Sequence, residues 1–284
     1  MISRREKNKK IINEIEREKT IKFSKKLTVI FIIIVILVIL LFLYMRFIGT
    51  SLIKTKERYL YDNIPSSFNG LKIVQISDLL YGSTINDKDL ERISNEIKMI
   101  NPDIIFFTGD LVSNSYNLIK KDNIESFLTN LSAPYGKYAI KGELDKEDFD
   151  LIFDKCGFEI LNNSTKEIFN KTVDKITIKG LNSNNVETVE NTDSYTICLI
   201  HNYDYLSNFN TNCDVTFAGH NLGGEIKIPF GSGILGDSKY KGSYYEVGNN
   251  QIFISSGLGS KHRLRLFNHP EINVYRIYQK ESNN

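Results

Sequence analysis

The chain has 284 residues, of which 41% are apolar and 25% are charged, and its formal net charge is +2. This balance is typical of a folded globular protein and excludes an intrinsically disordered or collagen-like chain. The three cysteines lack C-x-x-C spacing, so they support neither a disulfide framework nor a zinc cluster, and Cys198 is interpreted as a buried core residue.

The first element in chain order is an uncharged run, LTVIFIIIVILVILLFLYM, which occupies residues 27–45. A helix of this length rises about 28 Å, which is enough to cross a bilayer. A secretory signal peptide is the alternative interpretation, but the segment that follows, RFIGTSLIKTKERY, has no small-residue cleavage site. We therefore expect one uncleaved transmembrane helix over residues 27–48.

The charges on the two sides of this run predict its orientation. Residues 1–26 form a basic tail with ten Lys or Arg and four Glu. By the positive-inside rule the N-terminus is cytoplasmic, and the protein is a single-pass protein of the cell membrane with an extracytoplasmic C-terminal domain. Removing the tail's +6 and Arg46 from the formal +2 leaves about −5 for residues 51–284, so nucleic acid is not an expected partner.

Beyond the anchor, residues 49–67 are interpreted as a stalk and residues 68–280 as one α/β domain. From Leu71 onward short apolar runs alternate with helical or polar stretches. The spacing of Leu90, Ile93, Ile97 and Ile100 predicts an amphipathic helix. Strands are expected over 71–77, 103–108, 137–141, 167–182 (as a pair), 195–201, 214–219, 250–256 and 272–278.

Five polar side chains follow directly after expected strands: Asp78, Asp110, Glu143, His201 and His220. A single aspartate at such a position is usually a turn or cap residue. The carboxyl ends of strands in an open α/β sheet, however, share one crevice, so the five groups are expected to converge. Three carboxylates and two imidazoles suit a divalent ion such as Mn, Fe or Zn.

The spacing of these blocks resembles a known family. SDLLYG, FFTGDLV, YAIKGELD, LIHNYD and AGHNLGGEIKIP are similar, in order, to the D-x-H, GD, GNH-D/E, H and GH-x-H blocks of the calcineurin-like metallophosphoesterases. The closing segment resembles the membrane-anchored bacterial branch of that superfamily. The resemblance implies a four-layer α/β/β/α sandwich with two metal ions at the strand ends, where they hold the phosphate oxygens and activate the attacking water.

Three leucines depart from the family pattern. Leu80 and Leu222 stand where the resemblance expects histidines of the first metal site, and Leu144 replaces a histidine that resembles a leaving-group acid or phosphate clamp. The first site is therefore expected to be empty. The second keeps Asp110, His201 and His220, and Glu143 replaces its asparagine, so one ion is expected and a second is not.

We therefore expect a metal-dependent phosphoester hydrolase of the membrane surface with a reduced, one-metal site. The candidate metal ligands are Asp78, Asp110, Glu143, His201 and His220, and the candidate catalytic residues are Asp78, which orients water, and Asp110. A lipid-linked or envelope phosphoester is the expected substrate class. The alternative is a non-catalytic pseudo-phosphoesterase that binds a ligand or an envelope partner. Arg263 and Arg265 are interpreted as a solvated face.

Overall fold

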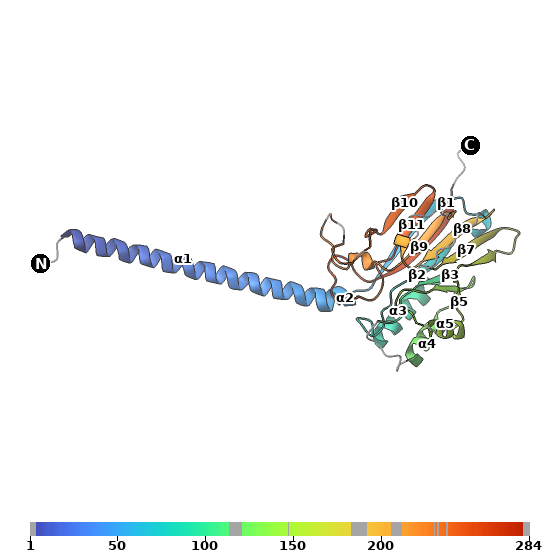
Figure 1. The fold of residues 1–284 in the computed structure, drawn as a ribbon, viewed down its shortest axis with the longest axis horizontal. Coiled ribbons are helices and arrows are strands. Elements are labelled where there is room, and N and C mark those ends of the chain that lie inside the picture. Colours follow the sequence, from blue (N-terminus) through green and yellow to red (C-terminus); the bar gives the residue numbers. More distant parts are fainter. Residues whose placement is uncertain are drawn as a thin grey trace. The chain divides into compact units, whose positions relative to one another are not determined.

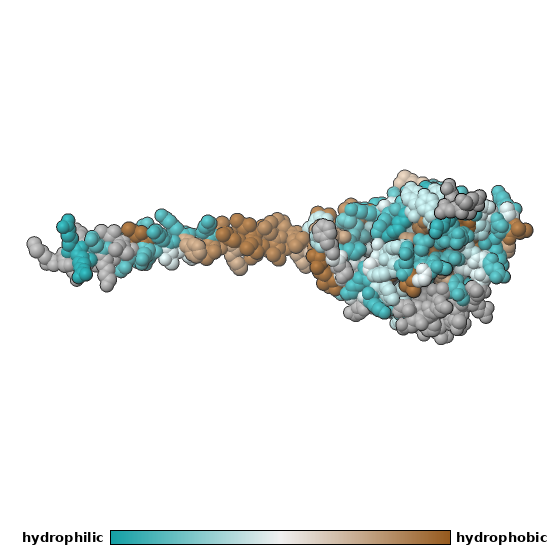
Figure 2. Space-filling model, turned by 90° about the horizontal axis from the view of Figure 1, so that it is seen from above, coloured by the Kyte–Doolittle hydropathy of each residue, from teal (hydrophilic) through white to brown (hydrophobic). Residues whose placement is uncertain are grey.

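The computed structural model describes residues 4–113, 121–146, 148–182, 192–205, 212–229, 231, 233–236 and 238–280. The chain divides into two compact units, Met1–Met45 and Arg46–Asn284. The first unit consists of helix α1 (Arg4–Leu43), which carries the apolar run drawn in brown in Figure 2. Among the described residues, one helical stretch, Asn13–Ser51, is long and apolar enough to cross a membrane.

The short helical segment η1 (Tyr44–Ile48) crosses the boundary between the two units in the chain, and α2 (Gly49–Ser51) follows it in the second unit. The first sheet of this second unit has the strand order β1-β12-β2-β3-β4-β5. Strands β2 to β5 run parallel, and β12 is antiparallel to β2. The strand bounds are β1 (Lys54–Asp62), β2 (Leu71–Ile76), β3 (Ile104–Thr108), β4 (Lys137–Ile140), β5 (Glu159–Ile160) and β12 (Glu271–Gln279).

The second sheet has the order β10-β11-β9-β8-β7-β6. Its four central strands, β7, β8, β9 and β11, are parallel, and β6 and β10 are antiparallel edge strands. The bounds are β6 (Ser164–Phe169), β7 (Lys175–Leu181), β8 (Tyr195–Ile200), β9 (Val215–Ala218), β10 (Tyr244–Val247) and β11 (Asn250–Ile254). Because parallel strands of both sheets end at one edge, the two sheets together can supply one site there.

Three apolar clusters hold these layers together. Helices α3 (Asp87–Ile100), α4 (Lys121–Asn130) and α5 (Asp148–Lys155) pack on the outer face of the first sheet (Figure 1). A second cluster, which includes Phe106, Phe217 and Tyr275, fills the space between the sheets. In the described part of the chain, the outer face of the second sheet is covered by Tyr203 of a 3-10 turn and by Tyr240 and Tyr245. The α/β two-sheet fold is therefore confirmed.

The expected strands all form, with ends that differ by one to three residues. A further strand, β1, lies inside the range 49–67 that was interpreted as a stalk, and it pairs with β12 at the sheet edge. The sequence analysis does not predict this strand, because Lys54, Lys56 and Arg58 interrupt any apolar run. β1 is an edge strand, and most of its side chains face solvent.

The interpretation of the cysteines is wrong in one respect, because Cys198 and Cys213 form a disulfide. The parallel pairing of β8 with β9 brings the two residues to a Cα–Cα distance of 5.9 Å, which lies in the normal range for such a bond. The two cysteines are 15 residues apart in the chain, and this spacing alone does not predict a disulfide. Cys156 is free and buried.

Candidate metal centre

The five candidate side chains all lie at the carboxyl ends of strands of the two sheets. Asp78, Asp110 and Glu143 follow β2, β3 and β4 of the first sheet, whereas His201 and His220 follow β8 and β9 of the second. Asp78, Asp110 and His220 have φ of 48°, 59° and 70°. Residues other than glycine rarely adopt this left-handed conformation, and it is often found at functional sites.

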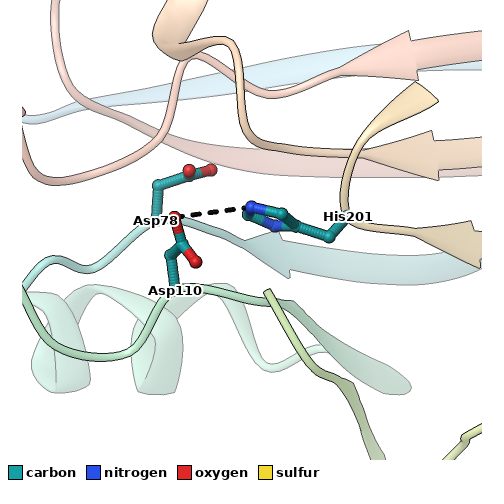
Figure 3. A group of neighbouring side chains, drawn as sticks. All are labelled: Asp78, Asp110 and His201. Carbon is teal, nitrogen blue, oxygen red and sulfur yellow. Dashed lines mark ion pairs between the residues drawn. The ribbon is translucent and has the colours of Figure 1, made fainter. Parts of the chain in front are cut away.

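Asp78, Asp110 and His201 form the inner group of the site (Figure 3). One ligand atom of each residue lies within 4.8 Å of the other two, and all three side chains are fully buried. Within the described residues, Asp78 Oδ1, Asp110 Oδ2 and His201 Nε2 have no hydrogen-bond partner. Burying three such atoms without hydrogen bonds is costly, and the ion pair between His201 Nε2 and Asp110 Oδ2 at 3.4 Å offsets only part of the cost. Two carboxylate oxygens and an imidazole nitrogen are ligands that a divalent transition metal prefers. The residues therefore fit a metal ion.

The orientation of His201 is fixed by the backbone. Its Nδ1 donates to the carbonyl oxygen of Thr108 at 2.7 Å, which directs Nε2 toward Asp110 Oδ2 at 3.4 Å. Such a second hydrogen bond selects the tautomer that leaves Nε2 available as a ligand. Burial disfavours a charged ring, but the carboxylates of Asp110 and Asp78 outweigh it and raise the pKa of His201 to about 10.

The two carboxyl groups respond to burial in opposite ways. Burial raises the pKa of Asp78, and the negative charge of Asp110 adds to this although His201 opposes it. For Asp110, burial is outweighed mainly by the positive charge of His201, and its pKa falls to about 2. One imidazolium thus stabilises one carboxylate but not both. A bound cation would supply the missing positive charge.

One oxygen of Asp78 is already engaged. Its Oδ2 accepts hydrogen bonds from the Ser77 hydroxyl at 2.5 Å and the His220 backbone N–H at 3.0 Å. These two donors fix the carboxylate so that Oδ1 remains free, which is how a second layer of residues commonly orients a metal ligand.

His220 and Glu143 lie on the outer side of this group, nearer to solvent. The His220 ring is 5.3 Å from that of His201, and its Nδ1 is 3.7 Å from Glu143 Oε2. Asn202 holds the other carboxylate oxygen of Glu143 at 3.1 Å. Burial and the charges of His201 and Lys261 lower the pKa of His220, which favours its neutral, ligating form. The structure thus brings all five residues into one crevice, with three in a tight group and two at its rim.

Two glycines permit the close approach of the two sheets. A Cβ atom on Gly109 would lie 2.5 Å from His201 Nδ1, and one on Gly219 would lie 2.0 Å from Ser77 Oγ. Neither distance leaves room for a side chain. The glycines that precede Asp110 and His220 are therefore required for the site to close.

Asp145 is a positioning residue that our sequence analysis missed. Its carboxylate accepts the backbone N–H groups of Asp110, Leu111 and Gly142, each at 2.8 Å, and so ties together the loops that follow β3 and β4. Burial and the charge of Asp110 raise its pKa to about 6. The signal was present in the block YAIKGELD, in which a carboxylate stands three residues after the loop glycine.

Leu80 and Leu222 occupy the other side of the crevice. Their side chains are 1% and 2% exposed. They lie against a glycine-containing segment: a Cβ on Gly259 would lie 2.5 Å from Leu80 Cβ, and one on Gly257 would lie 2.7 Å from Leu222 Cδ2. Neither leucine side chain has an atom that can bind a metal ion.

A pocket of about 520 Å³ opens beside the rim of the site. Glu143, His220, Leu222 and Lys261 are among the residues that line it. The ammonium group of Lys261 lies close enough to lower the pKa values of Asp78, Asp110 and His220 electrostatically. Sequence analysis gave Lys261 no role.

Arg265 is not part of a solvated face. It is fully buried, and its guanidinium donates to the carbonyl oxygens of Ser256 at 2.7 Å, Gly259 at 2.5 Å and Asn268 at 3.3 Å. Five donors in a rigid fork allow an arginine to organise a loop in this way. Arg263, by contrast, is exposed and lines a smaller pocket together with Leu80, Leu144 and Lys261.

Comparison with known proteins shows which family this chain resembles. The family model of calcineurin-like phosphoesterases matches residues 71–250. The uncharacterized metallophosphoesterase YkuE of Bacillus subtilis (strain 168) is 28% identical over 253 residues, or 82% of this chain and 88% of that protein. The UDP-2,3-diacylglucosamine pyrophosphatase LpxG of Chlamydia muridarum (strain MoPn / Nigg) is 24% identical over 290 residues, or 75% and 86% of the two chains. The crystal structure of TT1561 of Thermus thermophilus is 12% identical with a TM-score of 0.39, covering 66% and 90%.

Proposed function

Because the chain belongs to the calcineurin-like phosphoesterase family, we propose that it is a metal-dependent phosphoester hydrolase that works with a reduced, one-metal site at a membrane surface. The observation that supports this is the inner group. Three buried ligand atoms of Asp78, Asp110 and His201 converge without hydrogen-bond partners in the described residues.

Each residue has a distinct role in the proposal. Asp110 and His201 are the innermost ligands, and His220 and Glu143 complete the set from the rim. Asp78, whose Oδ2 is held by Ser77 and His220, offers Oδ1 either to the metal ion or to the attacking water. A bound Mn, Fe or Zn ion would offset the negative charge of the phosphoryl oxygens and make water a better nucleophile.

The cationic side chain of Lys261 supports phosphate binding at the mouth of the pocket. It lines both pockets beside the site and is exposed, so its charge acts where a phosphate group would enter. In a two-metal enzyme the second ion supplies part of this charge. Lys261 would supply some of it here.

Leu144 restricts the leaving groups that the site can use. It stands where the resemblance expects a leaving-group acid, and its side chain has no proton to give. Loss of a general acid typically costs about 10²- to 10⁴-fold in rate for a poor leaving group. We therefore propose substrates whose leaving group departs without protonation, such as phosphoanhydrides.

Two observations support a location on the outer face of the membrane. The apolar helix preceded by a basic tail fits an N-terminus-in anchor, and the Cys198–Cys213 disulfide fits an oxidising compartment. The relative LpxG is named as a pyrophosphatase of a diacylated sugar nucleotide. A lipid-linked or envelope phosphoester that also contains a phosphoanhydride bond, as a diphosphate diester does, is accordingly the substrate class that we propose.

Turnover by the full chain tests this function. We expect the Mn-loaded protein in nanodiscs to hydrolyse a panel of phosphomonoesters, phosphodiesters and phosphoanhydrides, with rates that fall as the leaving-group pKa rises. His220→Ala should lower the rate about a hundredfold or more, because losing a metal ligand costs several kcal/mol in the transition state. His269→Ala, which changes a histidine outside the ligand set, is the matched control.

The same experiment separates the enzyme from a binding protein. Metal-loaded protein with no turnover above the His220→Ala background on any substrate would contradict hydrolysis. The three leucines at positions 80, 144 and 222 favour that second candidate, a pseudo-phosphoesterase that binds its ligand through the same pocket.

A further inference from the structure

Six exposed apolar side chains lie on three segments of the second unit, and we call them the apolar face. They are Phe47 and Leu52 beside α2, Ile48 between them, Ile228 and Ile234 in the segment after β9, and Phe267 in the loop before β12. Phe267 is 62% exposed and Ile228 57% exposed. Large apolar side chains that gather on a surface in this way mark an interaction site.

The three segments are neighbours in space. Gly49 packs so closely on the carbonyl of Arg265 that a Cβ on Gly49 would lie 2.1 Å from that oxygen. Ile226 forms a bridge with Leu266, and the Lys227 N–H donates to the Leu266 carbonyl at 2.9 Å. The loop 263–268 therefore joins α2 on one side to residues 226–235 on the other.

The short connection between the apolar run and the apolar face limits the distance of this face from the membrane. The apolar run, residues 27–45, ends at Met45, and Gly49 is four residues further along. Since consecutive Cα atoms are about 3.8 Å apart, Gly49 lies within about 15 Å of Met45 in any arrangement of the two units. The loop that packs on Gly49 is held within the same short reach.

Basic side chains surround the apolar face. Lys54 and Lys56 are exposed on β1, and Lys227 lies near Lys56. The positive charge of Lys54 contributes to lowering the pKa of His269 in the neighbouring loop. Glu271 is an acidic neighbour, and its carboxylate lies 3.7 Å from the Lys56 ammonium group. Apolar side chains rimmed by lysines suit the interface of a bilayer with anionic head groups.

We infer that the apolar face docks on the same bilayer that α1 spans, so that Ile228, Ile234 and Phe267 enter the lipid head-group region. This inference rests on the membrane anchoring proposed above, but not on hydrolysis. Leu235 and Gly236, which follow Ile234 directly, line the 520 Å³ pocket together with His220. Docking would therefore place the mouth of that pocket beside the lipid surface.

The absence of tryptophan from the sequence allows a direct test. Single variants Phe267→Trp and Ile228→Trp of the full chain each carry one tryptophan, in two different segments of the apolar face. Each is reconstituted in vesicles of phosphatidylcholine and phosphatidylglycerol, with and without brominated acyl chains, which quench tryptophan fluorescence at contact distance. Phe31→Trp, within the apolar run of α1, reports on anchoring.

Phe169→Trp is the matched control. Phe169 is also an exposed phenylalanine, on the edge strand β6 of the second sheet, and no residue of the apolar face lies on that strand. We expect brominated lipid to lower the fluorescence of the variants at 31, 267 and 228 at least twofold and to leave that at 169 unchanged.

The outcomes separate the inference from its premise. Quenching at 31 without quenching at 267 and 228 would overturn docking and leave anchoring intact. No quenching at 31 would overturn anchoring, and docking with it. Because fluorescence is read without substrate, neither result depends on whether the protein hydrolyses a phosphoester.

Discussion

The two sides of the crevice differ in chemistry but not in burial. Asp110 and His201 on one side and Leu80 and Leu222 on the other are all nearly inaccessible to solvent. On the first side, ligand atoms lie close together without hydrogen-bond partners among the described residues, whereas on the second the leucine side chains pack against the glycine-containing segment 257–259. The first side is suited to bind a cation, and the leucine side chains on the second have no ligand atom.

The backbone at Leu80 and Leu222 has the same left-handed form as that at Asp78 and Asp110. Leu80 and Leu222 have φ of 44° and 50°, close to the values of Asp78 and Asp110. The left-handed conformation costs a leucine about 1–2 kcal/mol, and leucine gains nothing from it. The surrounding fold, rather than the leucine side chain, therefore stabilises this turn geometry.

The largest predicted effect on metal content comes from removing a ligand on the polar side. His201→Ala removes the imidazole whose Nε2 lies in the inner group, and Asp78 and Asp110 would then face each other without a buried cation. We expect the metal content of the full chain, measured by plasma mass spectrometry after Mn or Zn loading, to fall from about one ion per chain to near zero, since the inner site loses one of its few ligands.

His262→Ala is the control for nonspecific loss. His262 is partly exposed, and its ring contacts Glu225 rather than the inner group. Its metal content should stay near one. If wild type binds no Mn, Fe or Zn after loading, or if His201→Ala retains a full ion, the one-metal site is not where we propose it.

The strand ends explain how much of this site could be predicted from sequence. Each strand that delivers a ligand is a short apolar run that stops at a polar residue, so Asp78, Asp110 and His201 could be identified without coordinates. Asp145 stands in the block YAIKGELD, so the residue is visible in the sequence, but its contacts with three backbone N–H groups are not. Lys261 could not be identified, because its role depends on its place in a folded loop. The Cys198–Cys213 bond depends on strand order, and β1 is an edge strand with polar side chains, so neither has a local pattern.

A smaller effect is expected from restoring the apolar side. The double variant Leu80→His and Leu222→His puts two imidazoles where the resemblance expects ligands, on a backbone that already has the required turns. We expect the metal content to rise from about one ion toward two, because Asp78 Oδ1 and Asp110 are already in place. Each single variant adds one imidazole and should bind the second ion more weakly. A content that stays at one in the double variant would contradict the assignment of Leu80 and Leu222 to a lost first site.

The smallest effect on metal binding should come from changing a residue that positions the ligands of the polar side, without changing a ligand itself. Asp145→Asn keeps the shape of the side chain, but an amide cannot accept all three N–H groups that the carboxylate now accepts from Asp110, Leu111 and Gly142. We expect metal affinity to fall about 10- to 100-fold, as is usual when a group that orients a ligand is changed. We also expect the free energy of unfolding to fall by about 1–3 kcal/mol.

Asp150→Asn, which removes an exposed ion pair with Lys141, is the control and should change the free energy of unfolding by about 1 kcal/mol or less. Equal metal affinity in the two variants would mean that the polar side, like the apolar one, is shaped by the surrounding fold alone.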